Sequence, residues 1–112
     1  MSACEESGDL QFVCGLQQPE DLARIPSTRW LIASGFSQGA GLKLIDTRSR
    51  IAGFWYSEAT VQKHLQETYP DCALPPDAKL FNTQGISLRA RPGGQHTLYV
   101  TNHGGRETVE IF

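Results

Sequence analysis

Short runs of alternating or apolar residues, separated by turn residues, recur along the chain and predict strands. Residues 21–25 alternate apolar and polar side chains before Pro26. Residues 30–34 form a mostly apolar run, as in a strand that is buried on both faces. Two further runs lie at 42–46 and 51–56. We therefore expect four short strands with tight connections, which together form one antiparallel sheet.

The last third of the chain has the same organisation. Residues 85–90, 97–102 and 108–112 each alternate in polarity, and glycine pairs stand in the two gaps between them. The eleven glycines and six prolines of the chain favour turns over long helices. The pattern therefore predicts a second antiparallel sheet of three strands and an all-β fold.

Between the two predicted sheets the strand pattern is interrupted. Ser57 is a suitable N-cap, Val61 and Leu65 lie one helical turn apart, and Pro70 would end a helix. These signals predict one short helix near residues 58–68. An irregular connection between the sheets is the alternative.

Size and charge narrow the classes of function. A chain of 112 residues is one domain by length, with residues 1–11 a polar, flexible leader and residues 12–112 the folded part. The net charge of -2, with acids and bases interspersed, gives no electrostatic basis for binding nucleic acid. No apolar run approaches the ~18 residues of a membrane-spanning helix.

The three cysteines leave two questions open. Cys14 and Cys72 flank most of the predicted structure, and their pairing would stabilise the fold by ~4 kcal/mol on the chain-entropy account. Two unlinked thiols are the equal alternative. Cys4 remains, and the run Ser2-Ala3-Cys4 is similar to the end of a bacterial lipoprotein signal whose basic and apolar parts are missing. We keep export with a lipid anchor at Cys4 as one hypothesis and a cytoplasmic protein as the other.

Four stretches of the chain read PEDL at 19–22, LIASG at 31–35, FNTQGI at 81–86 and NHGGRETVE at 102–110. Together they resemble the opening segment of the paraoxonase/arylesterase family, whose members are calcium-dependent, six-bladed β-propeller hydrolases related to the gluconolactonases. The resemblance covers nearly the whole chain but only the amino-terminal third of the family's length. It implies two blades of a partial propeller, the first at about 20–56 and the second at about 85–112.

The resemblance also implies a set of site residues. In the family, the glutamate matching Glu20 binds the catalytic calcium, and the aspartate matching Asp21 binds a structural calcium. Ile86 falls where that structural ion takes a backbone carbonyl. The catalytic calcium would polarise the carbonyl oxygen of an ester or lactone. Without the resemblance, Glu20 and Asp21 would be interpreted as a solvated acidic pair.

The chain departs from the family at the position of the proposed general base. The family has a histidine where this chain has Gln84, and an amide cannot take up a proton near pH 7. His103 matches the second histidine of the family's proposed pair. Without its partner, we expect His103 to be a hydrogen-bonded residue in the tunnel wall. His64 and His96 match no motif, and we expect both to face solvent.

Length sets the functional expectation. A propeller blade takes ~40–50 residues, so six blades need more than twice this chain. Glu20 alone cannot hold a calcium ion, which takes six to eight oxygen ligands. We expect an amino-terminal fragment of a calcium-dependent lactonase or arylesterase that is inactive alone. The alternative is a non-catalytic binding or self-assembling module, in which several copies complete the ring.

Overall fold

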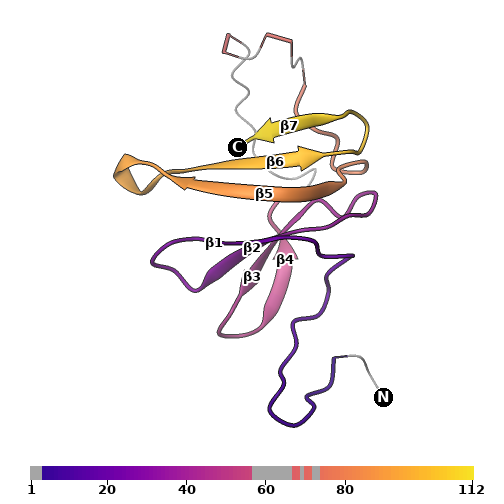
Figure 1. Ribbon diagram of the computed structural model, residues 1–112, viewed down its shortest axis with the longest axis vertical. Coiled ribbons are helices and arrows are strands. Elements are labelled where there is room, and N and C mark those ends of the chain that lie inside the picture. The colour runs from indigo at the N-terminus through magenta and orange to yellow at the C-terminus, as the bar shows by residue number, and fades with distance from the viewer. Residues whose placement is uncertain (1–3, 57–66, 69, 72–73) are drawn as a thin grey trace.

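Two antiparallel β-sheets form the protein, as shown in Figure 1. The computed structural model describes residues 4–56, 67–68, 70–71 and 74–112. The strands of the first sheet follow one another in the order β1 Leu22–Arg24, β2 Trp30–Ser34, β3 Leu42–Asp46 and β4 Ile51–Phe54. Those of the second sheet are β5 Thr83–Ala90, β6 His96–Asn102 and β7 Thr108–Ile111. The all-β prediction is confirmed, as are two antiparallel sheets of four and three strands.

The first sheet buries apolar residues on both faces of its central strands. Ile32 and Ala33 are neighbours in β2, so they point to opposite faces, and only 3% and 1% of their surfaces are exposed. Ile32 pairs with Leu44 of β3, and Leu42 at the start of β3 is fully buried. The prediction of a strand buried on both faces at residues 30–34 is therefore confirmed.

The second sheet buries one face and exposes much of the other. Leu98 and Val100 of β6 are buried, whereas Val109 and Ile111 of β7 are exposed. The hairpin between β5 and β6 turns through a short 3-10 segment, Pro92–Gly94, whose two glycines have φ of 77° and 76°. That left-handed conformation is easily reached only by glycine. The three strands predicted for the last third of the chain are therefore confirmed as a sheet, of which one face is largely exposed.

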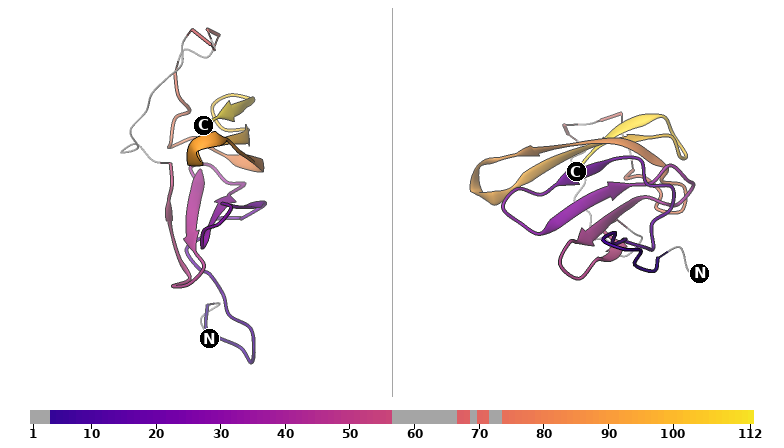
Figure 2. Two further views of the ribbon diagram at one scale, coloured as in Figure 1. Left: turned by 90° about the vertical axis from the view of Figure 1, so that its left-hand side faces the viewer. Right: turned by 60° about the horizontal axis from the view of Figure 1, so that its bottom comes forward.

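The two sheets pack on each other around an aromatic cluster, and Figure 2 shows them stacked along the long axis of the molecule. Phe81, which lies just before β5, is fully buried and contacts the rings of Tyr56 and Phe112 at centroid distances of 5.2 and 6.0 Å. Ile32 of the first sheet and Leu98 of the second sheet belong to the same cluster. Burial of one such aromatic side chain contributes about 1.5–3 kcal/mol.

Hydrogen bonds join the start of β5 to the loop between β2 and β3. The buried Thr83 hydroxyl accepts from the Gly35 amide at 2.7 Å and donates to the Gly41 carbonyl at 2.7 Å. The Gly41 amide donates to the Phe81 carbonyl at 2.9 Å. These bonds satisfy backbone groups that would otherwise be buried without a partner, so they fix how the second sheet meets the first.

The amino-terminal segment corrects one cysteine prediction. Cys14 forms a disulfide with Cys4, with a Cα–Cα distance of 6.0 Å, so the Cys14–Cys72 pairing is wrong, as is an unlinked Cys14. A turn in which Ser7 pairs with Leu10 brings Cys4 and Cys14 together. Closing so short a loop costs less chain entropy than closing the longer one. The bond also occupies the Cys4 sulfur that a lipid anchor would need.

Other expectations lie partly or wholly outside the described residues. The helix predicted near 58–68 is one of them, apart from Glu67 and Thr68, which lie in a turn. Cys72 and His64 lie outside them as well.

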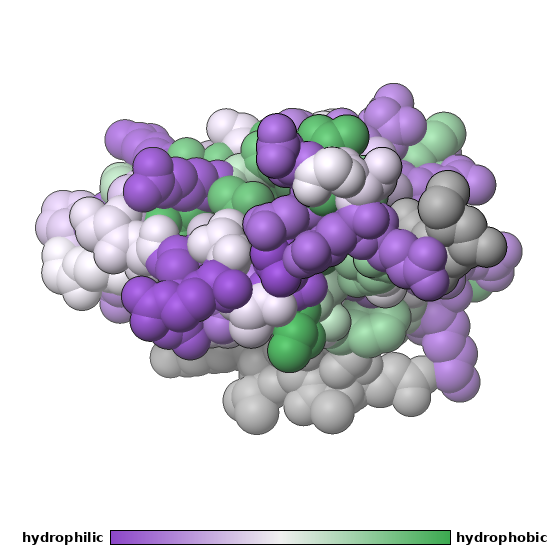
Figure 3. All heavy atoms as spheres, turned by 90° about the horizontal axis from the view of Figure 1, so that it is seen from below, coloured by the Kyte–Doolittle hydropathy of each residue, from purple (hydrophilic) through white to green (hydrophobic). Residues whose placement is uncertain are grey.

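Within the described ranges, no helix is long and apolar enough to cross a bilayer. Seen from below, the molecule is mostly hydrophilic, with hydrophobic residues in small separate groups (Figure 3).

Candidate functional site

Two of the predicted site residues meet at the junction of the sheets. The Asp21 side chain lies just before β1, and its Oδ2 accepts a hydrogen bond from the Ile86 amide of β5 at 3.0 Å. Asp21 is held there by Ser34, whose hydroxyl accepts from the Asp21 amide at 3.0 Å and whose own amide donates to the Asp21 carbonyl. Glu20, one residue earlier, is exposed. The structure therefore joins Asp21 to Ile86 and leaves Glu20 at the surface beside them.

An irregularity in the pairing of β5 directs the Gln84 side chain toward the end of β6. The register between β5 and β6 shifts between Thr83 and Ile86, as in a β-bulge. Within the shift, the Thr101 hydroxyl accepts from the Gly85 amide at 2.8 Å and donates to its carbonyl at 3.2 Å. The bulge changes the direction of the strand locally, so the exposed Gln84 side chain reaches the end of β6.

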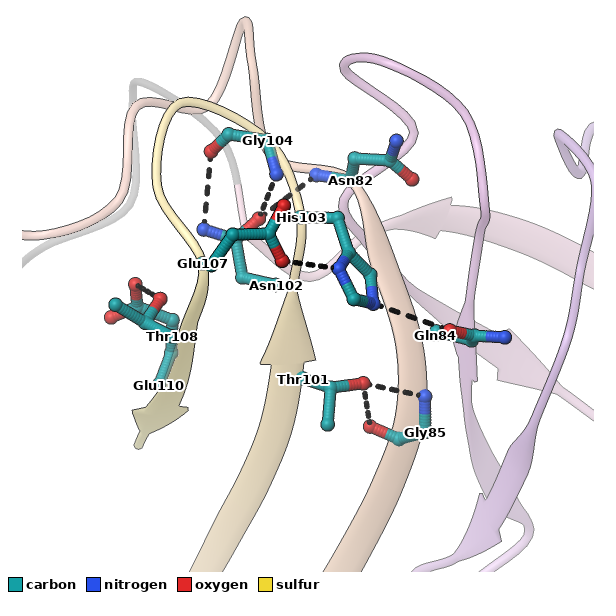
Figure 4. A network of polar contacts seen from close by, with 10 residues as sticks. All are labelled: Asn82, Gln84, Gly85, Thr101, Asn102, His103, Gly104, Glu107, Thr108 and Glu110. Carbon is teal, nitrogen blue, oxygen red and sulfur yellow. Dashed lines mark hydrogen bonds and ion pairs between the residues drawn. The ribbon is translucent and has the colours of Figure 1, made fainter.

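His103 follows β6 and lies between two polar side chains, as Figure 4 shows. Its Nδ1 is 2.5 Å from Oε2 of Glu107, and its Nε2 is 3.2 Å from Oε1 of Gln84. The Phe36 ring, from the loop after β2, packs edge-on against the imidazole at a centroid distance of 5.8 Å. His103 is therefore hydrogen-bonded, as the sequence predicted, and its contacts come from both sheets.

The turn between β6 and β7 is built around Asn102, which is 1% exposed. Its Oδ1 accepts from the amides of Gly104 and Asn82 at 2.8 and 3.2 Å, and its Nδ2 donates to the Gly104 carbonyl at 3.2 Å. The His103 amide in turn donates to the Asn82 carbonyl at 2.9 Å. Because Asn102 is buried and bonded on both sides, the turn holds the His103 backbone in one place (Figure 4).

Gly104 has no room for a side chain. A Cβ at this position would lie 1.5 Å from the Leu80 carbonyl oxygen. The next residue, Gly105, has a φ of 79°. The glycine pair that the sequence marked only as a turn is therefore required both for close backbone approach and for a left-handed conformation.

A second carboxylate, Glu110, anchors β7 behind this turn. Its two oxygens accept from Arg106 Nε and Nη2 at 2.7 and 2.8 Å, and the Thr108 hydroxyl donates to it at 2.6 Å. Burial raises the pKa of Glu110, but these hydrogen bonds and the Arg106 charge outweigh burial and lower it below the ordinary value. Glu110 is thus an ionised structural group whose side chain is 9% exposed.

The described residues do not fit a complete calcium site. The Oδ1 of Asp21 accepts from the Leu22 amide at 2.8 Å, and its Oδ2 already accepts from Ile86. Among the residues that the structure describes, no group of three or more His, Cys, Asp or Glu side chains could hold a metal ion. Asp21, Glu20 and one carbonyl would leave most of the six to eight oxygen ligands of calcium to come from elsewhere.

Sequence reasoning missed Glu107 and Phe36. Glu107 stands four residues after His103, but a two-glycine turn separates them, and spacing across a turn of unknown shape does not predict contact. Phe36 lies in the loop after β2 of the first sheet, so only packing of the sheets brings it to His103. His96, expected to face solvent in a turn, is exposed but is the first residue of β6.

Compared with protein-family models, curated proteins and solved structures, the chain matches none.

Proposed function

We propose that this chain supplies two adjacent blades of a β-propeller hydrolase of the paraoxonase/arylesterase type, which acts on esters or lactones with calcium. The contact between Asp21 and Ile86 carries the proposal. The resemblance assigns the Asp21 carboxylate and the Ile86 carbonyl, 65 positions apart, to one calcium ion. In the structure the Asp21 Oδ2 accepts from the Ile86 amide, so the two residues lie side by side, although the carbonyl is not the contacting group.

The arrangement of the strands is compatible with blades. Each sheet is an up-and-down meander in sequence order, and the first strand of each, β1 and β5, lies at the junction with the other. Asp21 contacts Ile86 of β5, and Gln84, two residues before Ile86 in the same strand, contacts His103. These contacts lie at one end of that junction. In a ring of blades, the first strands line the central tunnel, so this end would be one mouth of the tunnel.

The chain by itself is not expected to hydrolyse these substrates. Its own residues leave the calcium site incomplete, and the remaining ligands would come from blades outside the 112 residues. At the position of the family's base, Gln84 has no group that takes up a proton near neutral pH. What the chain's own residues do in this proposal is hold Asp21 and orient His103.

Calcium titration by calorimetry, together with assays on phenyl acetate and a lactone, tests the proposal. We expect weak binding, with a Kd of about 1 mM, and no calcium-dependent turnover. Asp21→Asn should abolish the binding, whereas Asp77→Asn, at an exposed carboxylate outside the junction, should leave it unchanged. No heat of binding at millimolar calcium, or equal binding by the Asp21 variant, would contradict the proposal.

A second function, a non-catalytic self-assembling module, is favoured by one observation. The outermost strands expose large apolar side chains, Ile51 and Phe54 on β4 and Val109 and Ile111 on β7. Exposed edge strands of this kind pair with other chains unless they are covered. Concentration-dependent association in analytical ultracentrifugation, without any Asp21-dependent calcium binding, would favour the module over the hydrolase.

A further inference from the structure

Three side chains from three separate segments contact the His103 ring. Glu107 comes from the β6–β7 turn, Gln84 from β5, and Phe36 from the loop after β2 in the other sheet. An exposed histidine without a role typically turns freely in solvent. Here 38% of the His103 side chain remains exposed, yet both ring nitrogens and one ring edge have neighbours. The ring is therefore held in one orientation.

The Glu107 contact decides which ring nitrogen carries the proton. A carboxylate has acceptor atoms only, so the Nδ1 that lies 2.5 Å from Oε2 must be the donor. In a neutral imidazole with the proton on Nδ1, the lone pair is on Nε2. Glu107 thereby makes Nε2 the nitrogen able to accept a proton.

The Gln84 carboxamide stands where that lone pair points. With its oxygen toward the ring, as drawn in Figure 4, both ring nitrogens would have to donate. With the amide turned by half a rotation, its NH2 group donates to the Nε2 lone pair of a neutral ring. In either orientation, Gln84 occupies the place beside Nε2 that a water molecule would need in order to lose a proton to it.

We infer that Glu107 is the positioning residue of His103, fixing Nε2 as its basic nitrogen, and that Gln84 covers this nitrogen. The inference deepens the proposed function, because it assigns the state of the histidine at the proposed tunnel mouth. It makes His103 a base that is oriented but covered. A smaller side chain at position 84 would expose Nε2 without disturbing the fold, since Gln84 is exposed.

The proton position is tested by long-range 1H–15N spectra of the full chain labelled at histidine, recorded at about pH 9, where imidazole is neutral. We expect His103 with its proton on Nδ1 in the wild-type chain. Glu107→Gln should shift the ring to a mixture of both tautomers, since an amide can donate or accept. Glu5→Gln, at another exposed glutamate, is the matched control and should change nothing.

The covering of Nε2 is tested by acylation with diethyl pyrocarbonate, followed by peptide mass spectrometry. His96, exposed at the other end of β6, is the internal reference. Gln84→Ala should raise the rate at His103 relative to His96 by about two- to tenfold, the range expected for loss of one neutral hydrogen bond. Gln11→Ala, at an exposed glutamine in the amino-terminal segment, should leave the His103 rate unchanged.

The outcomes separate this inference from the proposed function. A wild-type His103 with the proton on Nε2, or a tautomer that Glu107→Gln leaves unchanged, would overturn the role of Glu107. An unaltered acylation rate in Gln84→Ala would overturn the covering role of Gln84. Neither measurement involves calcium or ester, so the hydrolase proposal can fail in its own test while both of these results stand.

Discussion

The two sheets use buried carboxylates for different purposes. In the first sheet, Asp46 organises the β3–β4 turn, accepting from the Arg48 amide at 2.9 Å and lying 3.0 Å from Arg29 Nε. In the second sheet, Glu110 binds the side chains of Arg106 and Thr108. Burial raises the pKa of each carboxyl, and hydrogen bonds and a neighbouring arginine outweigh burial and lower it.

The two sheets also differ in where their polar groups lie. Asp46 lies at the end of β3, in register with Trp30 at the start of β2, which is the end away from Ser34 and the sheet junction. The polar groups of the second sheet gather in the β6–β7 turn beside His103. Asp46 of the first sheet therefore closes a turn away from the junction, whereas the polar groups of the β6–β7 turn hold a candidate site.

The substitution with the largest expected effect removes a side chain on which both sheets pack. Phe81→Ala deletes a fully buried ring between them and should lower the free energy of unfolding by about 3–5 kcal/mol. Urea unfolding should be followed by far-UV circular dichroism and by the fluorescence of Trp30 in β2 and of Trp55, which follows β4 and packs against Phe112. Phe54→Ala, at a ring that is 57% exposed, is the control and should cost far less. Separate transitions for the two probes in the wild-type chain would show that the sheets unfold independently.

Substituting one glycine in each sheet region by alanine compares how tightly the two regions are packed. Gly104→Ala forces a Cβ against the Leu80 carbonyl and should cost about 3 kcal/mol, because backbone must move. Gly53→Ala in β4 meets nothing within 4 Å and should be neutral or stabilising by up to about 1 kcal/mol. Thermal unfolding of the two variants measures the difference. Equal melting temperatures would mean that the β6–β7 turn is looser than described.

The smallest expected effect concerns charge and pH. The pKa of Glu110 is lowered in the folded state, so its stabilisation is present above the ordinary value of 4.5 and is lost as pH falls through the folded pKa. Glu110→Gln should cost about 1–2 kcal/mol at pH 7 and weaken the loss of stability in acid. Urea midpoints between about pH 3 and pH 7 measure both effects. Glu6→Gln, which removes an exposed ion pair with Arg50, should change stability by less than about 0.5 kcal/mol; an equally large effect there would contradict the contrast.

Most of the fold could be predicted because strand signals are local. Short apolar or alternating runs between turn residues gave β2 and β3 with their observed bounds and β6 to within one residue. β5 begins two residues earlier than expected, at Thr83, because Thr83 pairs with Asn102 of β6 across the register shift. Propeller blades remain a prediction, since two sheets do not establish a ring.

The residues of the candidate site could be predicted in part, because motifs, like strand signals, are local in the sequence. The motifs pointed to Asp21, Ile86, Gln84 and His103, but the contacts of Asp21 with Ile86 and of Gln84 with His103 depend on how two sheets meet. Nothing local indicated Glu107 or Phe36, which reach His103 through a turn and across the sheet junction.

The sequence by itself determined which of the described segments become strands and where turns separate them, because each depends on neighbours along the backbone. Only the tertiary structure decided that Phe81 lies between the sheets and that His103 has contacts on three sides. Those outcomes depend on the packing of residues far apart in the chain, and a pattern with a period of two contains no information about it.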